Sequence, residues 1–251
     1  MDLPPELLDE IIGHLPPDDE KSLRSCSLVA KSWVHPSRRH LFETVRLSGV
    51  GGLGSWLATT PPTNVEIFQH VRSLTFHTTS IPDSPHGPAH LLHEHSSSFH
   101  RLERLTLSHG CPPSHSRIGT FAAFQHTLAY LCLWCCSVTA SGLVTFVNYF
   151  PNLAHLEVGF LSRKADDQPT PPFSRPLQKL TVTEVYSDDG LGFIDQLMAL
   201  HPQCDEVTVS SFWSSSPSVA RCVIYGVEAN VKRLYIKSLY KGVHSVLKIL
   251  Q

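Results

Sequence analysis

The sequence has no hydrophobic stretch long enough to cross a membrane. Its most apolar segment, residues 128–136, is nine residues long, whereas a transmembrane helix needs about 20 apolar residues. The N-terminus, residues 1–6, lacks the basic start and the apolar run of a secretory signal peptide. We therefore expect a protein that has no membrane segment and is not secreted.

The sequence also lacks the features of a disulfide-stabilised or nucleic-acid-binding protein. Its 7 cysteines are an odd number at irregular spacing, and no Asn-x-Ser/Thr sequon occurs, which favours free thiols and a cytoplasmic or nuclear location. Lys plus Arg number 20 against 22 Asp plus Glu, so no surplus of positive charge is present to neutralise phosphates. Apolar residues at 41% and charged residues at 17% are typical of a folded globular chain.

Familiar active-site motifs are missing. There is no G-x-S-x-G, Walker A, H-E-x-x-H or paired-carboxylate motif. Gly49, Gly51 and Gly54 form G-x-G-x-x-G, but the strand expected at residues 71–76 is followed by His77 and not by the acidic residue that a dinucleotide site requires. We interpret these glycines as a turn, and we predict no catalytic residue and no cofactor.

Two groups of potential metal ligands have a simpler interpretation. One group lies in a Ser- and Pro-rich segment and consists of His86, His90, His93, His95 and His100, which is typical of a solvated loop. The other consists of Cys132, Cys135 and Cys136 and contains one C-x-x-C without the second pair of a zinc site. We predict no metal site and free thiols near the core.

The first forty residues predict two or three short helices. The first is indicated by apolar residues at helical spacing, with Pro5 in its first turn and Pro16 at its end: Leu3, Leu7, Leu8, Ile11, Ile12 and Leu15. A second helical segment with an apolar face is expected after Asp18, its N-cap. Pro36 is expected to end this segment. So small a unit usually depends on a neighbour or a partner for stability.

This segment resembles an F-box of the fungal F-box-like form over residues 1–45. The resemblance rests on Leu3-Pro4-Pro5-Glu6-Leu7-Leu8, Ile11-Ile12, Leu15, residues 26–33 and residues 38–42, although residues 18–22 are more polar than usual and Ala30 replaces a common cysteine. Helices of this family bind a Skp-family adaptor, which links them to a cullin scaffold and a RING subunit. The resemblance implies adaptor contacts by Leu3, Pro4, Leu7, Ile11, Leu28, Val29 and Trp33.

Residues 46–251 repeat the pattern L-x-x-L-x-L, the strand signature of a leucine-rich repeat. The middle apolar residue of each copy stands at 74, 105, 131, 156, 180, 207 and 234, so successive copies are 24 to 31 residues apart, and residues 42–47 are a possible eighth copy. Helical patterns follow at 141–150, 191–200 and 218–227, and loops are expected at 80–98 and 162–176. An apolar helical pattern from Val243 to the last residue suggests that the array is truncated.

These patterns predict an α/β protein with N-terminal F-box helices followed by a degenerate leucine-rich-repeat solenoid with a curved parallel sheet. Alternation along each strand places the repeated apolar residues inward and their neighbours on the exposed concave face. On that face we expect a target protein to bind Tyr130, Trp134, His155 and Glu157, since aromatic residues dominate interface energies. In the alternative interpretation, loops cover these rings and Trp134 belongs to the core.

The function predicted by the sequence is that of a substrate-recognition subunit of an SCF-type cullin-RING ubiquitin ligase. The F-box would hold the adaptor, and the repeats would hold an unknown target protein. An alternative is a repeat scaffold or sensor outside the ligase, in which the N-terminal helices are only a cap for the array. An enzyme on an α/β frame is the third alternative, which the repeat periodicity disfavours.

Overall fold

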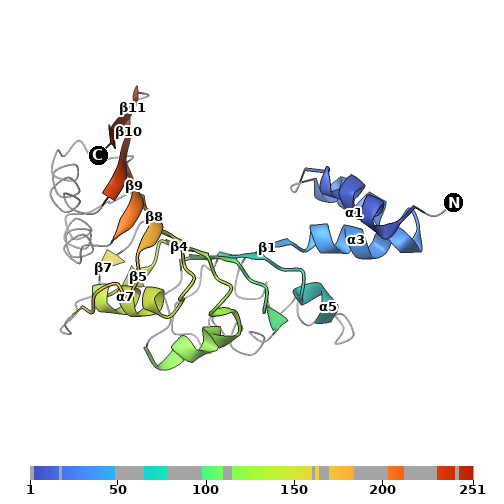
Figure 1. Ribbon diagram of the computed structural model, residues 1–251, viewed down its shortest axis with the longest axis horizontal. Coiled ribbons are helices and arrows are strands. Elements are labelled where there is room, and N and C mark those ends of the chain that lie inside the picture. Colours follow the sequence, from blue (N-terminus) through green and yellow to red (C-terminus); the bar gives the residue numbers. More distant parts are fainter. Residues whose placement is uncertain are drawn as a thin grey trace.

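The computed structural model describes residues 3–16, 19–48, 65–77, 98–109, 115–159, 162–163, 170–183, 203–211, 231–240 and 243–250. The chain begins with three helices, α1 (Pro5–Gly13), α2 (Glu20–Cys26) and α3 (Lys31–Leu41), which lie at one end of the molecule (Figure 1). A large sheet follows them. This order of elements confirms the predicted fold class, N-terminal helices followed by a parallel-strand solenoid.

The large sheet has nine strands, and their spatial order is their order in the sequence. They are β1 (Thr44–Ser48), β2 (Ser73–His77), β3 (Arg104–Ser108), β4 (Tyr130–Trp134), β6 (His155–Gly159), β8 (Leu177–Thr183), β9 (Cys204–Ser211), β10 (Val231–Tyr240) and β11 (Val243–Leu250). The first eight pair in parallel. The eighth sequence copy, at residues 42–47, is therefore a strand of the sheet. Membership of the leucine-rich-repeat class stays a prediction.

The repeat pattern of the sequence becomes a ladder of buried side chains in the sheet. The middle apolar residue of each copy is the Cα partner of the corresponding residue in the next strand: Val45, Leu74, Leu105, Leu131, Leu156, Leu180, Val207 and Leu234. All eight are buried. Since side chains alternate between the two faces of a strand, this register also lines up the neighbouring residues on the opposite face.

The junctions between units are also repetitive. At the start of each of five successive strands, two consecutive backbone N–H groups donate to one carbonyl of the preceding unit, at 2.8 to 3.1 Å. The accepting carbonyls belong to Glu43, Arg72, Glu103, Ala129 and Ala154. Each shared carbonyl satisfies two backbone N–H groups that would otherwise be left unpaired where a strand begins.

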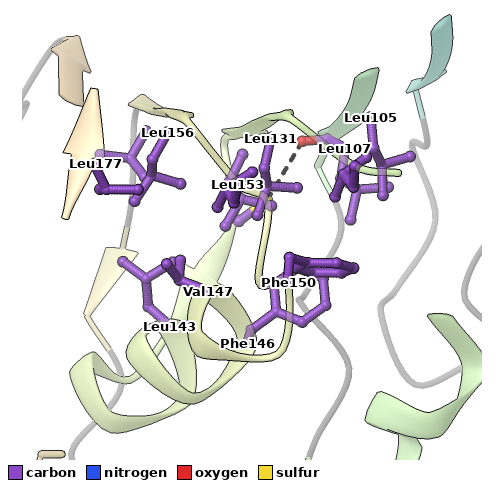
Figure 2. Close-up of a cluster of buried hydrophobic side chains, with 14 of the residues drawn as sticks. Leu105, Leu107, Leu131, Leu143, Phe146, Val147, Phe150, Leu153, Leu156 and Leu177 are labelled. Atoms are coloured by element: carbon purple, nitrogen blue, oxygen red, sulfur yellow. Dashed lines mark hydrogen bonds between the residues drawn. The ribbon is translucent and has the colours of Figure 1, made fainter. Parts of the chain in front are cut away.

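Helical segments cover one side of the sheet (Figure 1): α5 (Val65–Phe68), the 3-10 segment η3 (His115–Phe124) and α7 (Ala140–Asn148). The helix predicted at residues 141–150 is thus confirmed as α7. Figure 2 shows Phe146 and Phe150 turned toward the leucines of the strands, and their ring centroids lie 5.2 Å apart. The helices predicted at 191–200 and 218–227 lie outside the described residues.

Two predictions of local structure are wrong in the N-terminal helices. The N-cap of α2 is Asp19 and not Asp18, because the Asp19 carboxylate accepts a hydrogen bond from the Ser22 amide at 3.0 Å. Pro36 does not close a helix, since it lies buried within α3, which continues to Leu41. Burial of the proline ring offsets the single backbone hydrogen bond that a proline removes.

Two predictions are also wrong further along the chain. The segment predicted as an apolar C-terminal helix forms β11, which pairs antiparallel with β10. The segment expected to be a loop at residues 162–176 contains a short strand, β7 (Ser162–Arg163), paired in parallel with β5 (Ser137–Val138). In both cases a neighbouring strand offers hydrogen-bonding partners that the local sequence pattern does not reveal. The loop expected at residues 80–98 lies almost entirely outside the described residues.

Candidate functional site

The N-terminal helices are apolar on more than one face. Leu8 and Ile12 of α1 and Leu23 of α2 are each 1% exposed and form the interior of this unit. Arg39 of α3 donates to the Asp9 carboxylate of α1 at 2.7 Å, which fixes the first and third helices together at the surface. The unit therefore has its own small core and does not need the remaining apolar residues for internal packing.

Those remaining apolar residues face solvent. The exposed large hydrophobic side chains of the described residues are Leu3 (46% exposed), Leu7 (45%), Ile11 (46%), Leu28 (85%) and Val29 (65%), and we call them the exposed apolar set. Leu7 and Ile11 are four residues apart, so they share one side of α1, and Leu3 lies just before the N-cap of this helix. Pro4 is also exposed, and Trp33 is half-buried. Such exposure of several large apolar side chains is typical of an interaction surface.

A second candidate site is a pocket of ≈ 440 Å³ on the opposite face of the sheet from the buried ladder. Its lining contains all four residues that the sequence predicted for this face: Tyr130, Trp134, His155 and Glu157. Tyr130 and His155 are direct Cα partners on β4 and β6. The structure thus brings the four residues together, and whether they bind a target stays a prediction.

The Glu157 carboxylate lies at the centre of this pocket's polar contacts. The phenol of Tyr130 donates a hydrogen bond of 2.6 Å to Glu157 Oε2. Burial, together with this hydrogen bond, raises the pKa of Tyr130 above its usual range. Burial and the Glu157 charge raise the pKa of the neighbouring Cys132 thiol to about 12. Both groups are therefore neutral at physiological pH.

Trp134 is neither a fully exposed anchor nor a core residue. Its side chain is half-buried and lies directly over Gly159, where an added Cβ would be 2.5 Å from the ring atom Cε3. The absence of a side chain at Gly159 therefore allows the indole to lie against β6. Because Trp134 also lines the pocket, part of its ring remains available to a ligand.

An ion pair holds Lys179, one of the residues that line the pocket. Glu206 accepts from Lys179 Nζ at 2.7 Å and lies 3.5 Å from Arg233 Nη2. The hydrogen bond from Lys179 lowers the pKa of Glu206 below its usual range. Unlike Glu157, Glu206 therefore has its negative charge compensated within the sheet.

The prediction from sequence missed part of this lining. The additional lining residues are Leu156, Lys179, Thr181, Thr183, Thr208 and Ser210. All but Leu156 occupy the same outward positions of β8 and β9 as the predicted residues do on β4 and β6. Alternation along each strand identifies these residues as exposed candidates, but it does not reveal which strands together enclose a pocket.

A second cavity, of ≈ 480 Å³, lies where the N-terminal helices meet the first strands. Its walls include Leu15 and His40 from the helical unit and Arg72 and Arg104 from the sheet. The two parts also touch where the rings of His35 and His70 meet edge to face at 5.4 Å. A cleft at this junction means that the helices cover the start of the sheet incompletely.

The other sequence features yield no site within the described residues. There, no cluster of three or more potential ligands could hold a metal ion, and no helix is long and apolar enough to span a bilayer. No disulfide joins the described cysteines, which include Cys132, Cys135 and Cys136. The glycines of the G-x-G-x-x-G pattern and the histidines from His86 to His95 lie outside the described residues.

Comparisons with known proteins identify the N-terminal unit only. A comparison with curated proteins finds no match. The F-box domain family matches residues 1–34, the segment that contains α1, α2 and the exposed apolar set. F-box domains bind Skp-family adaptors, and this chain carries an F-box domain at residues 1–34.

Proposed function

We propose that this protein is the substrate-recognition subunit of an SCF-type cullin-RING ubiquitin ligase in the cytoplasm or nucleus. The F-box helices bind a Skp-family adaptor, and through it a cullin scaffold and a RING subunit. The sheet, which we assign to the leucine-rich-repeat class, binds the target protein on its concave face. The chain acts by bringing the target close to a ubiquitin-charged enzyme and needs no active site of its own.

The observation that carries this proposal is the exposed apolar set. Its five members coincide with five of the seven residues for which the F-box resemblance implies adaptor contacts. Leu28, at 85% exposed, buries little apolar surface within the isolated chain. The exposure of the five side chains is therefore best explained by a partner that buries them, at about 25 cal/mol for each Å² of apolar surface removed from water.

The alternative function, a scaffold whose helices only cap the repeats, receives less support. A cap would turn its free apolar side chains onto the first strand of the array. Here Leu7 and Ile11 remain exposed, and a cleft of ≈ 480 Å³ lies at the junction between helices and sheet.

Substitution within the exposed apolar set tests the adaptor half of the proposal. Replacing both Leu7 and Leu28 with Glu should abolish co-purification of a purified Skp-family adaptor, because two carboxylates would be buried in an apolar interface. The melting temperature of the free chain should fall only slightly, since Leu28 is 85% and Leu7 45% exposed. Glu10→Ala, at an exposed polar position of α1, is the matched control and should retain adaptor binding. If the wild-type chain captures no adaptor, the ligase assignment fails and the capped scaffold replaces it.

A further inference from the structure

The pocket on the concave face contains Glu157, a carboxylate that forms no ion pair with the described residues. The described residues provide Glu157 with a single hydrogen-bonding partner, the neutral phenol of Tyr130 at 2.6 Å, and with no cation. Glu206, on the neighbouring strand β9, differs, since it contacts both Lys179 and Arg233. A half-buried carboxylate without a cation is electrostatically unfavourable, and it gains free energy when a cation binds.

Two aromatic residues of β4, Tyr130 and Trp134, flank Cys132, which is the Cα partner of Glu157 on β6. Tyr130 donates to the Glu157 carboxylate, and Trp134 lies over Gly159, two residues after Glu157 on β6. Cations are attracted to the faces of such rings, with Trp the strongest. The Tyr130 ring already contacts one cation, since the guanidinium carbon of Arg104 lies 5.7 Å from the ring centroid. Aromatic rings and a carboxylate together are a suitable environment for a positively charged side chain.

The remaining lining is also compatible with a cation. Hydroxyl groups of Thr181, Thr183, Thr208 and Ser210 line the pocket, and their oxygens can accept hydrogen bonds from ammonium or guanidinium groups. Lys179 also lines the pocket, but its ammonium group pairs with Glu206 at 2.7 Å. An anionic ligand, by contrast, would have to displace Glu206 from Lys179 and would lie beside Glu157.

We infer that this pocket takes one positively charged side chain, arginine or lysine, from the target protein, held by Glu157 and flanked by Trp134 and Tyr130. The inference rests on the proposed role of the concave face in target binding. It adds the chemical class of the residue that is recognised. The raised pKa values of Tyr130 and Cys132, both partly caused by Glu157, agree with an uncompensated negative charge at this position.

Degenerate peptide pools test the inference on the full chain. Four fluorescent heptapeptide pools, each with Arg, Lys, Gln or Glu fixed at the centre and random flanks, would be titrated by anisotropy. The Arg or Lys pool should bind at least about tenfold more tightly than the Gln pool, because a charge-assisted hydrogen bond is stronger than a neutral one. Comparison of the Arg and Lys pools identifies which cation is preferred.

Two matched variants locate the effect. Glu157→Gln keeps an acceptor for the Tyr130 phenol but removes the charge, and it should reduce the preference for the Arg or Lys pool to within about twofold. Asp205→Asn removes a carboxylate that pairs with Lys232 at 2.7 Å and does not line the pocket, so it should leave the preference intact. Tightest binding by the Glu pool, equal binding by the Gln and Arg pools, equal losses in both variants or no binding by any pool would each overturn the inference.

Adaptor capture by the same preparation separates this inference from the proposed function. If the chain captures the adaptor but shows no cation preference, the inference alone fails. If the cation preference is present without adaptor capture, the pocket assignment stands and the ligase proposal fails.

Discussion

Trp134 and Gly159 depend on each other at the pocket. The backbone of Gly159 is not in the left-handed region, so alanine fits the backbone, and the cost of Gly159→Ala arises from the indole that lies 2.5 Å from the new Cβ. We expect Gly159→Ala to lower the free energy of unfolding by about 1 to 3 kcal/mol. In a Trp134→Ala background the same substitution should cost less than about 0.5 kcal/mol, because the ring is absent.

Chemical denaturation of the four proteins in this cycle measures the coupling. An equal cost of Gly159→Ala with and without the indole would contradict the contact between Trp134 and β6. The result matters for function, because the same contact determines where the ring stands beside Glu157.

The surroundings of two cysteine thiols also control the pH at which each thiol ionises. Burial is the main cause that raises the pKa of Cys132 and of Cys204 to about 12, whereas an unfolded cysteine has a pKa of about 8.5. The folded state therefore disfavours the thiolate. Its stabilisation by these neutral thiols is complete below about pH 8.5 and is lost as the pH rises toward 12.

Iodoacetamide labelling followed by mass spectrometry tests this behaviour. At pH 8.5 the half-buried Cys26 should react well before Cys132 and Cys204, because only the thiolate is nucleophilic. In denaturant the three should react at similar rates. Labelling of Cys132 in the folded chain as fast as Cys26 would show that the concave face is open to solvent at that point.

At the scale of single helices and strands, the regular spacing of apolar residues was the most reliable basis for prediction. The apolar periodicity predicted α1, α7 and all eight parallel strands, because each buries a repeated apolar stripe. It did not separate the exposed Leu7 from the buried Leu8 on α1, since both are leucines at helical spacing. The F-box resemblance separated them, because it implies contacts for particular positions.

The elements that were predicted wrongly depend on distant partners. Val243 and Val246 are three residues apart, which is compatible with a helix, but β10 offers an unpaired edge with which this segment pairs as β11. For the pocket, alternation identified the outward residues of each strand. The enclosure formed by β4, β6, β8 and β9 arises from how the sheet curves, and no local pattern encodes it.

At the scale of the whole molecule, the two proposed binding surfaces are separate. The helices that carry the exposed apolar set lie at one end (Figure 1). The pocket lies on β4, β6, β8 and β9, four strands from the middle of the order in the sheet. An adaptor on the helices therefore leaves the concave face free for a target, as a substrate receptor requires.

Hydrogen exchange of the full chain, with and without a purified Skp-family adaptor, tests this central claim most directly. We predict that the adaptor slows amide exchange in α1 and in the turn around Leu28, because these residues become buried and their helices open less often. Exchange in β4, β6 and β8 should be unchanged. Unaltered exchange in the helices, or protection of the concave strands by the adaptor, would contradict the account.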